Sequence, residues 1–140
     1  MRENIGLYRG KRKDNGEWVE GAYYKQTLYY GDPCEKHYII TSTESLDYDQ
    51  AFEYYEVDPE TVGQYIGGIP DKNGTKIFEG DILNTSNSNC RIWYVDYKNT
   101  AFCANQGNAN YSCVLDEFMQ YSSVEVIGNR FDNPELLQNT

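Results

Sequence analysis

The sequence has no apolar run approaching the roughly 20 residues that a membrane-spanning helix requires. Residues 1–6 carry charge but no apolar core of the kind found in secretory signals, so no export signal is indicated. There is no C-x-x-C pair, and the four cysteines stand at irregular separations: Cys34, Cys90, Cys103 and Cys113. In a reducing compartment we expect these to be free and mostly buried thiols. The expected location is therefore the cytoplasm.

The sequence motifs of catalysis and cofactor binding are also missing. There is no G-x-x-x-x-G-K-[ST], G-x-G-x-x-G or G-x-S-x-G pattern, and no cluster of His and Cys ligands for a metal. His37 is the single histidine, and we expect it on a strand, exposed or hydrogen-bonded, although a pairing with a Cys or Ser stays open. With 22 acidic residues, two neighbouring carboxylates would not mark a glycosidase pair. We expect no catalytic residues, cofactor, metal or small-molecule substrate, and a protein that is not an enzyme.

What the chain does contain favours β structure. Its 140 residues suit one domain, and 39% hydrophobic with 24% charged residues is typical of a globular protein. The 14 tyrosines raise the aromatic share to 15%, and Tyr packs well on the pleated surface of a sheet. Short apolar segments between Gly and Asn turns predict a mainly β fold, a small antiparallel β-barrel or meander with one or two short helical turns.

Turn signals set the expected elements, because Asn-Gly tolerates the positive φ angles of tight hairpins. Asn15-Gly16 predicts a first hairpin, and Asp71-Lys72-Asn73-Gly74 predicts a second tight turn. Asp58 followed by Pro59 is typical of a helix start. The expected strands are 5–9, 17–24, 27–30, 36–40, 53–57, 76–78, 82–83, 90–97, 100–103, 111–115 and 123–129, with a loop at 42–50 and helical turns at 58–62 and 133–137.

Three segments together resemble one protein family. Residues 56–83 read EVDPETVGQYIGGIPDKNGTKIFEGDIL, residues 7–24 read LYRGKRKDNGEWVEGAYY, and residues 124–137 read VEVIGNRFDNPELL. These segments, about 60 of the 140 residues, resemble the YopX family of phage and prophage proteins. One departure is the inserted-looking Gly67-Gly68-Ile69-Pro70, where family members tend to be tighter.

The resemblance implies a fold and an origin, but no activity. It implies a single domain over residues 1–140: an N-terminal β-hairpin region at 1–58, a helical turn and tight turn at 59–75, and an SH3-like β-roll at 76–140. It also implies a phage or prophage origin in a bacterial cytoplasm. The family brings no catalytic residues with it.

The segment 71–81 has the oxygen-rich start of a calcium loop, but its spacing is wrong. An EF-hand loop needs Gly at position six and Glu at position twelve, whereas Gly74 is fourth and Glu79 is ninth. A turn explains the pattern, since Asn and Gly are wanted there for their geometry. We interpret the segment as a structural motif whose acids bind backbone N–H groups to fix a bend; its residues are Gly67, Asp71, Asn73, Gly74, Glu79, Gly80 and Asp81.

Charge is segregated along the chain, whose net charge is −10. Residues 1–13 hold five basic residues against one acidic residue, whereas residues 14–140 hold seven basic and 21 acidic residues. The basic turn, with Trp18 beside it, suits a phosphate backbone and a stacked base, and its cations are Arg9, Lys11, Arg12 and Lys13. The acidic remainder opposes a long nucleic-acid footprint and favours a solvated turn instead.

The densest acidic stretch, residues 44–60, contains seven acidic residues and no basic residue. It raises the alternative of a DNA mimic that blocks a DNA-binding protein, with Glu53, Glu56 and Glu60 in the mimicking surface. Tyrosine doublets suggest an interface, because one member of each pair would face outward from a strand, and Tyr29 and Tyr54 are the candidates.

The leading hypothesis is a non-enzymatic accessory protein that acts through contacts with another protein or through homo-oligomerisation. It follows from the missing catalytic motifs together with abundant Tyr and segregated charge. A nucleic-acid-binding module and a DNA mimic are the two alternatives, and no membrane partner is expected.

Overall fold

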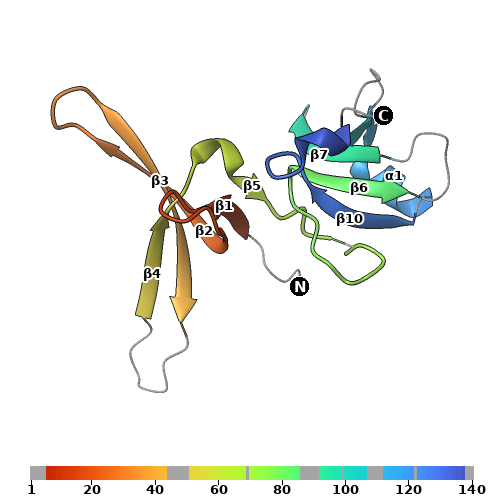
Figure 1. Ribbon diagram of the computed structural model, residues 1–140, viewed down its shortest axis with the longest axis horizontal. Coiled ribbons are helices and arrows are strands. Elements are labelled where there is room, and N and C mark those ends of the chain that lie inside the picture. Colours follow the sequence, from red (N-terminus) through yellow and green to blue (C-terminus); the bar gives the residue numbers. More distant parts are fainter. Residues whose placement is uncertain are drawn as a thin grey trace. The chain divides into compact units, whose positions relative to one another are not determined.

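The computed structural model describes residues 6–43, 51–68, 70–85, 92–98, 100–106, 112–121 and 123–137. The chain forms two compact units: the first ends at Tyr65 and the second begins at Ile66. Each unit carries one five-stranded antiparallel sheet (Figure 1). The division into three segments expected above stays a prediction.

The sheet of the N-terminal unit has the strand order β4-β3-β2-β1-β5. Its strands are β1 (Tyr8–Lys11), β2 (Trp18–Leu28), β3 (Cys34–Thr43), β4 (Ala51–Glu56) and β5 (Gly63–Gln64), and the short helix η1 (Pro59–Thr61) precedes β5. The first hairpin is confirmed: Gly16 adopts a φ of 73°, and its N–H donates to the Arg12 carbonyl over 2.9 Å. The helix start is confirmed as well, because the Asp58 side chain accepts a hydrogen bond from the Glu60 N–H.

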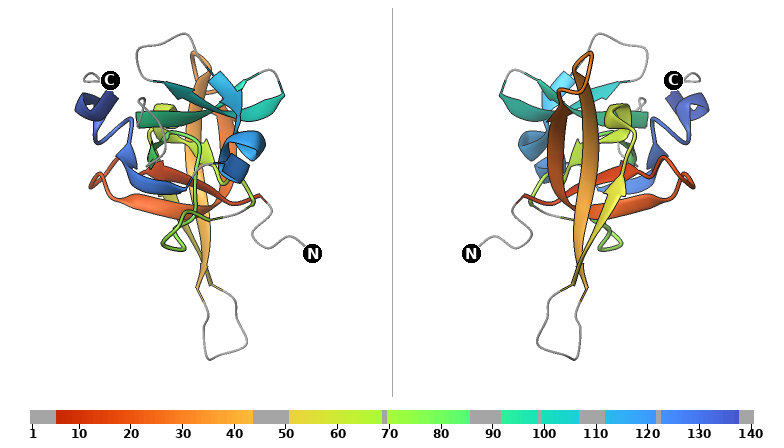
Figure 2. Two further views of the ribbon diagram at one scale, coloured as in Figure 1. Left: turned by 90° about the vertical axis from the view of Figure 1, so that its right-hand side faces the viewer. Right: turned by 90° about the vertical axis from the view of Figure 1, so that its left-hand side faces the viewer.

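Strand β2 pairs first with β1 and then with β3, and Gly21 lies where the partner changes. Residues 18–21 pair with β1, and residues 22–28 pair with β3 (Figure 2). At the junction, a Cβ on Gly21 would lie 2.2 Å from the Ile40 carbonyl oxygen. The absence of a side chain therefore lets β2 approach β3 closely at this point.

The sheet of the C-terminal unit has the strand order β10-β6-β7-β8-β9. Its elements are β6 (Asp81–Thr85), β7 (Ile92–Lys98), β8 (Ala101–Gln106), β9 (Ser112–Val114), α1 (Leu115–Tyr121), β10 (Val124–Asn129) and η2 (Pro134–Leu137). The principal core cluster lies here, and its buried members are Ile77, Leu83, Trp93, Val95, Ala104, Leu115, Phe118 and Val124. Trp93 and Phe118 bring their ring centroids to 4.8 Å across the core.

The mainly β, antiparallel prediction is confirmed, with corrections in detail. Both strand orders are linear in the described residues, so neither sheet closes into a barrel there, and the SH3-like roll stays a prediction. The strand expected at 76–78 is wrong, since these residues lead into a turn before β6 begins at Asp81. The loop expected from residue 42 is wrong at its start, because β3 continues to Thr43.

The expectation of mostly buried thiols holds only in part. Cys103 is buried, whereas Cys34 is exposed and Cys113 is half-buried, and all three are free thiols. Cys90 lies outside the described residues.

The bend before β6 predicts a sharp difference between two glycines. Gly80 has a φ of 94°, and an added Cβ would lie 3.0 Å from the Phe131 ring, whereas Gly74 has a φ of 82° with nothing within 4 Å. We expect Gly74→Ala to cost about 1 kcal/mol of unfolding free energy from backbone strain alone. Gly80→Ala adds the clash and costs about 2–3 kcal/mol. Urea unfolding followed by Trp93 fluorescence in a Trp18→Phe background measures both, and equal losses would contradict the assignment.

Candidate interaction surfaces

Strand register gathers apolar side chains on one side of the N-terminal sheet. Tyr24 is opposite Tyr38, and Ile40 is opposite Tyr54. Phe52, two residues before Tyr54 on β4, has its side chain on the same side because side chains alternate along a strand. We call Tyr24, Tyr38, Ile40, Phe52 and Tyr54 the aromatic face.

Three members of the aromatic face are exposed, and the opposite side of the same strands is packed at Ile39 and Val57. Tyr24, Phe52 and Tyr54 are 51%, 54% and 66% exposed. On the packed side, Ile39 and Val57 are fully buried. The N-terminal unit therefore takes its core from one side of the sheet and leaves the other side to solvent.

The two tyrosine doublets behave differently. In the second doublet, Tyr54 is exposed while Tyr55 is half-buried beneath Arg12, whose Cζ lies 4.2 Å from the ring centroid. In the first doublet, Tyr29 and Tyr30 are 78% and 95% exposed. Both are exposed because β2 ends at Leu28, so no strand alternation applies to them.

The basic turn is largely engaged in contacts within its own unit. Arg9 lies 4.7 Å from the Trp18 ring centroid, and Lys11 lies 5.8 Å from it. Arg12 pairs with Asp14 over 2.6 Å, and Lys13 pairs with Glu56 over 3.6 Å. Two cations therefore lie against the Trp18 ring. The hydrogen bond from Arg12 lowers the pKa of the Asp14 carboxyl below its ordinary value.

The acidic candidates do not share one surface. Glu53 and Glu56 are three residues apart on β4, so their side chains lie on opposite sides of the sheet. Glu53 accepts a hydrogen bond from the Tyr55 hydroxyl, whose pKa is raised chiefly by that bond. Of the stretch 44–60, residues 44–50 lie outside the described residues, including Glu44, Asp47 and Asp49.

His37 takes part in a small polar cluster. The Tyr23 hydroxyl is hydrogen-bonded to Nδ1 of His37, and a carboxylate oxygen of Glu35 lies 3.9 Å from Nε2. Burial raises the pKa of Tyr23 above that of a free phenol. Tyr23 is therefore neutral near pH 7 and does not supply an anionic nucleophile there.

Asp71 organises the tight turn that the sequence marked. One carboxylate oxygen accepts the N–H groups of Asn73 and Thr75 over 2.9 and 2.8 Å, and the other accepts the Val126 N–H over 2.9 Å. Burial by itself raises the pKa of Asp71, but these three donors and Lys72 outweigh it, so the pKa lies below its ordinary value. The carboxylate thus joins the turn to β10, which lies 55 residues away in the chain.

The rest of the structural motif lies around the bend before β6. Asp81 is 1% exposed and accepts the Phe78 N–H over 2.8 Å. The Gly80 N–H donates to the Val95 carbonyl over 2.7 Å. Glu79 is half-buried, and Gly67 adopts a φ of 68° in the segment that leaves Tyr65.

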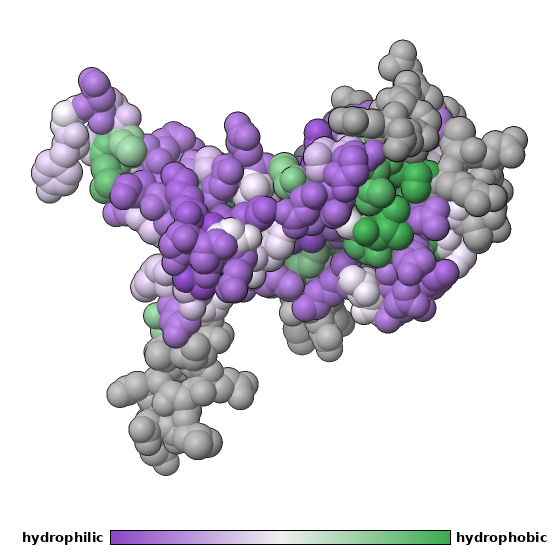
Figure 3. All heavy atoms as spheres, viewed as in Figure 1, coloured by the Kyte–Doolittle hydropathy of each residue, from purple (hydrophilic) through white to green (hydrophobic). Residues whose placement is uncertain are grey.

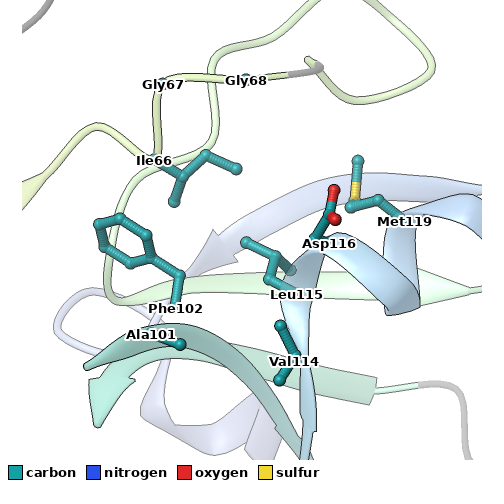
Figure 4. A pocket seen from close by; sticks show the side chains of 9 residues that line it. All are labelled: Ile66, Gly67, Gly68, Ala101, Phe102, Val114, Leu115, Asp116 and Met119. Atoms are coloured by element: carbon teal, nitrogen blue, oxygen red, sulfur yellow. The ribbon is translucent and has the colours of Figure 1, made fainter. Parts of the chain in front are cut away.

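Sequence reasoning missed an apolar pocket in the C-terminal unit (Figure 4). It has a volume of about 290 Å³. Its lining comes from three places in the chain: Ile66, Gly67, Gly68, Ala101, Phe102, Val114, Leu115, Asp116 and Met119. Figure 4 shows Ile66, Phe102 and Leu115 pointing toward one another, with the Asp116 carboxylate as the one charged group.

The pocket was missed because helix α1 was missed. A strand was expected over 111–115, but β9 ends at Val114 and α1 begins at Leu115. The spacing of Leu115, Phe118 and Met119 is the i, i+3, i+4 signal of an amphipathic helix and could have revealed it.

Metal-binding clusters and membrane-spanning helices are both absent from the described part of the chain. No group of three His, Cys, Asp or Glu residues there could hold a metal ion. None of the helices in those same ranges is long and apolar enough to cross a membrane. In the view of Figure 3, hydrophobic residues of the C-terminal unit gather over β6 and β10, whereas the N-terminal unit is mostly hydrophilic by residue type.

The family model described as YopX protein matches residues 7–138, nearly the whole chain. The chain belongs to the YopX family. The match includes the three segments that carried the resemblance, and it also spans the tracts between them. A search of curated proteins gives no match for this YopX-family chain.

The hydrogen bonds of Asp71 in this YopX-family chain predict a pH-dependent contribution to stability. The pKa of Asp71 is lower in the folded state, so its contribution is present at neutral pH and is lost as the pH falls below about 4. We expect Asp71→Asn to reduce the unfolding free energy by about 1–3 kcal/mol at pH 7. Urea unfolding in the Trp18→Phe background should show the difference shrinking at pH 3. A difference independent of pH would contradict the charged role.

Proposed function

We propose that this YopX-family chain is a non-enzymatic accessory protein of phage or prophage origin that acts in the bacterial cytoplasm by binding a protein. The binding surface is the aromatic face of the N-terminal sheet, and the bound protein is either another chain or a second copy. The observation that supports the proposal is a set of large, half-exposed side chains, Tyr24, Phe52 and Tyr54, on one side of a sheet whose core lies on the other side.

The chemistry of the aromatic face suits protein recognition. Tyr and Phe are enriched in the buried centres of interfaces, where they supply large contact area at low conformational-entropy cost. β3 has hydrogen-bonded neighbours on both sides, so the side chains that it and its neighbours carry are held in a fixed arrangement. Fully burying one such side chain is worth about 1.5–3 kcal/mol, so covering the exposed parts of Tyr24, Phe52 and Tyr54 favours a contact at this face.

The two alternative functions draw less support from the described residues. The cations of the basic turn are engaged with Trp18, Tyr55 and neighbouring carboxylates, which leaves less charge for a phosphate backbone. Glu53 and Glu56 point to opposite sides of β4, whereas a DNA mimic needs its acids on one surface. Protein binding through the aromatic face is therefore the preferred proposal.

Replacing the aromatic face should abolish partner capture without unfolding the protein. In the double variant Phe52→Ser and Tyr54→Ser, we expect each lost aromatic to cost about 2 kcal/mol of binding free energy, or about thirtyfold in Kd. The measurement is quantitative pull-down from bacterial lysate, with light scattering after size exclusion for self-association.

Tyr97→Ser is the matched control, because Tyr97 is 53% exposed but belongs to the C-terminal unit. It should retain whatever the unchanged protein retains. If the unchanged protein captures a partner, a double variant that captures the same amount would refute the proposal. If the unchanged protein is an oligomer, a double variant with the same oligomeric state would refute it.

A further inference from the structure

Strand β4 is at the edge of its sheet in the described residues, since β3 is its one hydrogen-bonded neighbour in the strand order (Figure 1). The Val57 N–H donates to the His37 carbonyl over 2.9 Å, so His37 and Val57 form a hydrogen-bonded pair. Such pairs alternate along an antiparallel ladder with pairs whose backbone groups point away from each other. By that alternation, the N–H and C=O groups of Phe52 and Tyr54 point away from β3.

The neighbouring residue Glu56 supports this assignment. It has the same parity as Phe52 and Tyr54, and its carbonyl accepts the Lys13 N–H over 2.9 Å, on the side away from β3. The turn that contains Lys13 therefore occupies one end of this edge. The edge that remains presents two outward donor–acceptor pairs at i and i+2, the spacing with which an antiparallel strand is added to a sheet.

The side chains on the two sides of β4 determine which residue types an added strand would need opposite them. Phe52 and Tyr54 lie on the aromatic face, whereas Glu53 lies on the opposite side and is exposed. Residues opposite each other in a ladder place their side chains on the same side of the sheet, and opposite charges in such pairs are favourable. The fitting strand thus has apolar residues opposite Phe52 and Tyr54 and a basic residue opposite Glu53.

We propose that the outer edge of β4 takes up an extended segment of a partner protein in which apolar and basic residues alternate, added as an antiparallel strand. The inference rests on the proposed function, because the apolar residues of that segment extend the aromatic face. The charge of the surrounding chain agrees with it, since residues 44–60 contain seven acidic residues and no basic residue.

A second copy of the chain fits this edge less well. Pairing Phe52 with Tyr54 of another copy, and Tyr54 with its Phe52, uses all the outward groups of both residues. That register places Glu53 directly opposite the other copy's Glu53, and like charges opposite each other are destabilising. Glu53 therefore opposes self-pairing and favours a cation, in keeping with the use of charge to protect sheet edges.

The first test separates the backbone from the side chain at position 54. Tyr54→Pro removes the outward N–H, and the ladder with β3 does not use that N–H; Tyr54→Val removes the aromatic ring and keeps the N–H. The probe is an acetylated, amidated peptide of about seven residues alternating Val and Lys, with a Val–Glu peptide as control. Titration should show that Tyr54→Pro binds the Val–Lys peptide at least about tenfold more weakly than Tyr54→Val.

The second test measures hydrogen bonding at the outer edge of β4 in the unchanged protein. Amide hydrogen exchange followed by NMR should show the Phe52 and Tyr54 amides becoming protected when the Val–Lys peptide is added. The Glu53 and Tyr55 amides, already directed to β3, should change little. Glu53→Lys should reverse the charge preference, so that the Val–Glu peptide binds more tightly than the Val–Lys peptide. These readouts stand even where the proline variant fails to fold.

Several outcomes would overturn the inference. They are no binding of the Val–Lys peptide, equal affinity of the Tyr54→Pro and Tyr54→Val variants, and no exchange protection at Phe52 and Tyr54. Protection of both amides in a peptide-free dimer would assign the edge to a second copy instead. The proposed function fails on a separate result: the Phe52→Ser and Tyr54→Ser double variant still captures the partner, or still forms the oligomer, that the unchanged protein does.

Discussion

The alternation of side chains along β3 is the constraint on which the N-terminal unit depends. Ile39 is fully buried, so its neighbours Tyr38 and Ile40 must lie on the other side of the sheet. Pairing with β2 and β4 extends that assignment across three strands and brings Tyr24 and Tyr54 onto the same side. A shift of one residue in register would exchange the two sides, exposing the core and burying the aromatic face.

The same backbone pattern links the aromatic face to the edge of β4. Phe52 and Tyr54 have their side chains on the exposed side of the sheet and, by the ladder alternation, their backbone groups at its outer edge. In the proposed complex, this pair of residues supplies both apolar contact and backbone hydrogen bonds, and Glu53 between them favours a basic residue in the added strand.

Sequence patterns predicted well where the signal was local. Asn15-Gly16 and Asp71–Gly74 identified their turns, because few residues adopt positive φ, and Asp58-Pro59 identified a helix start. Prediction failed where distant contacts decide. Residues 76–78 have strand-like composition, yet the Ile77 carbonyl accepts the Ile66 N–H. That partner does not follow from the local pattern, whereas the bond from the Phe78 N–H to the Asp81 carboxylate is the local bend contact that the sequence indicated.

By itself, the sequence determined the mainly β class, the turns, the segregation of charge and the YopX family, because each of these depends on residues close together in the chain or on a family-wide pattern. Only the tertiary structure decided which tyrosines face solvent, how the basic turn is neutralised, and that Ile66, Phe102 and Leu115 line one pocket. The physical reason is that strand register and the packing of α1 are set by contacts between residues far apart in sequence, which one strand's alternation does not specify.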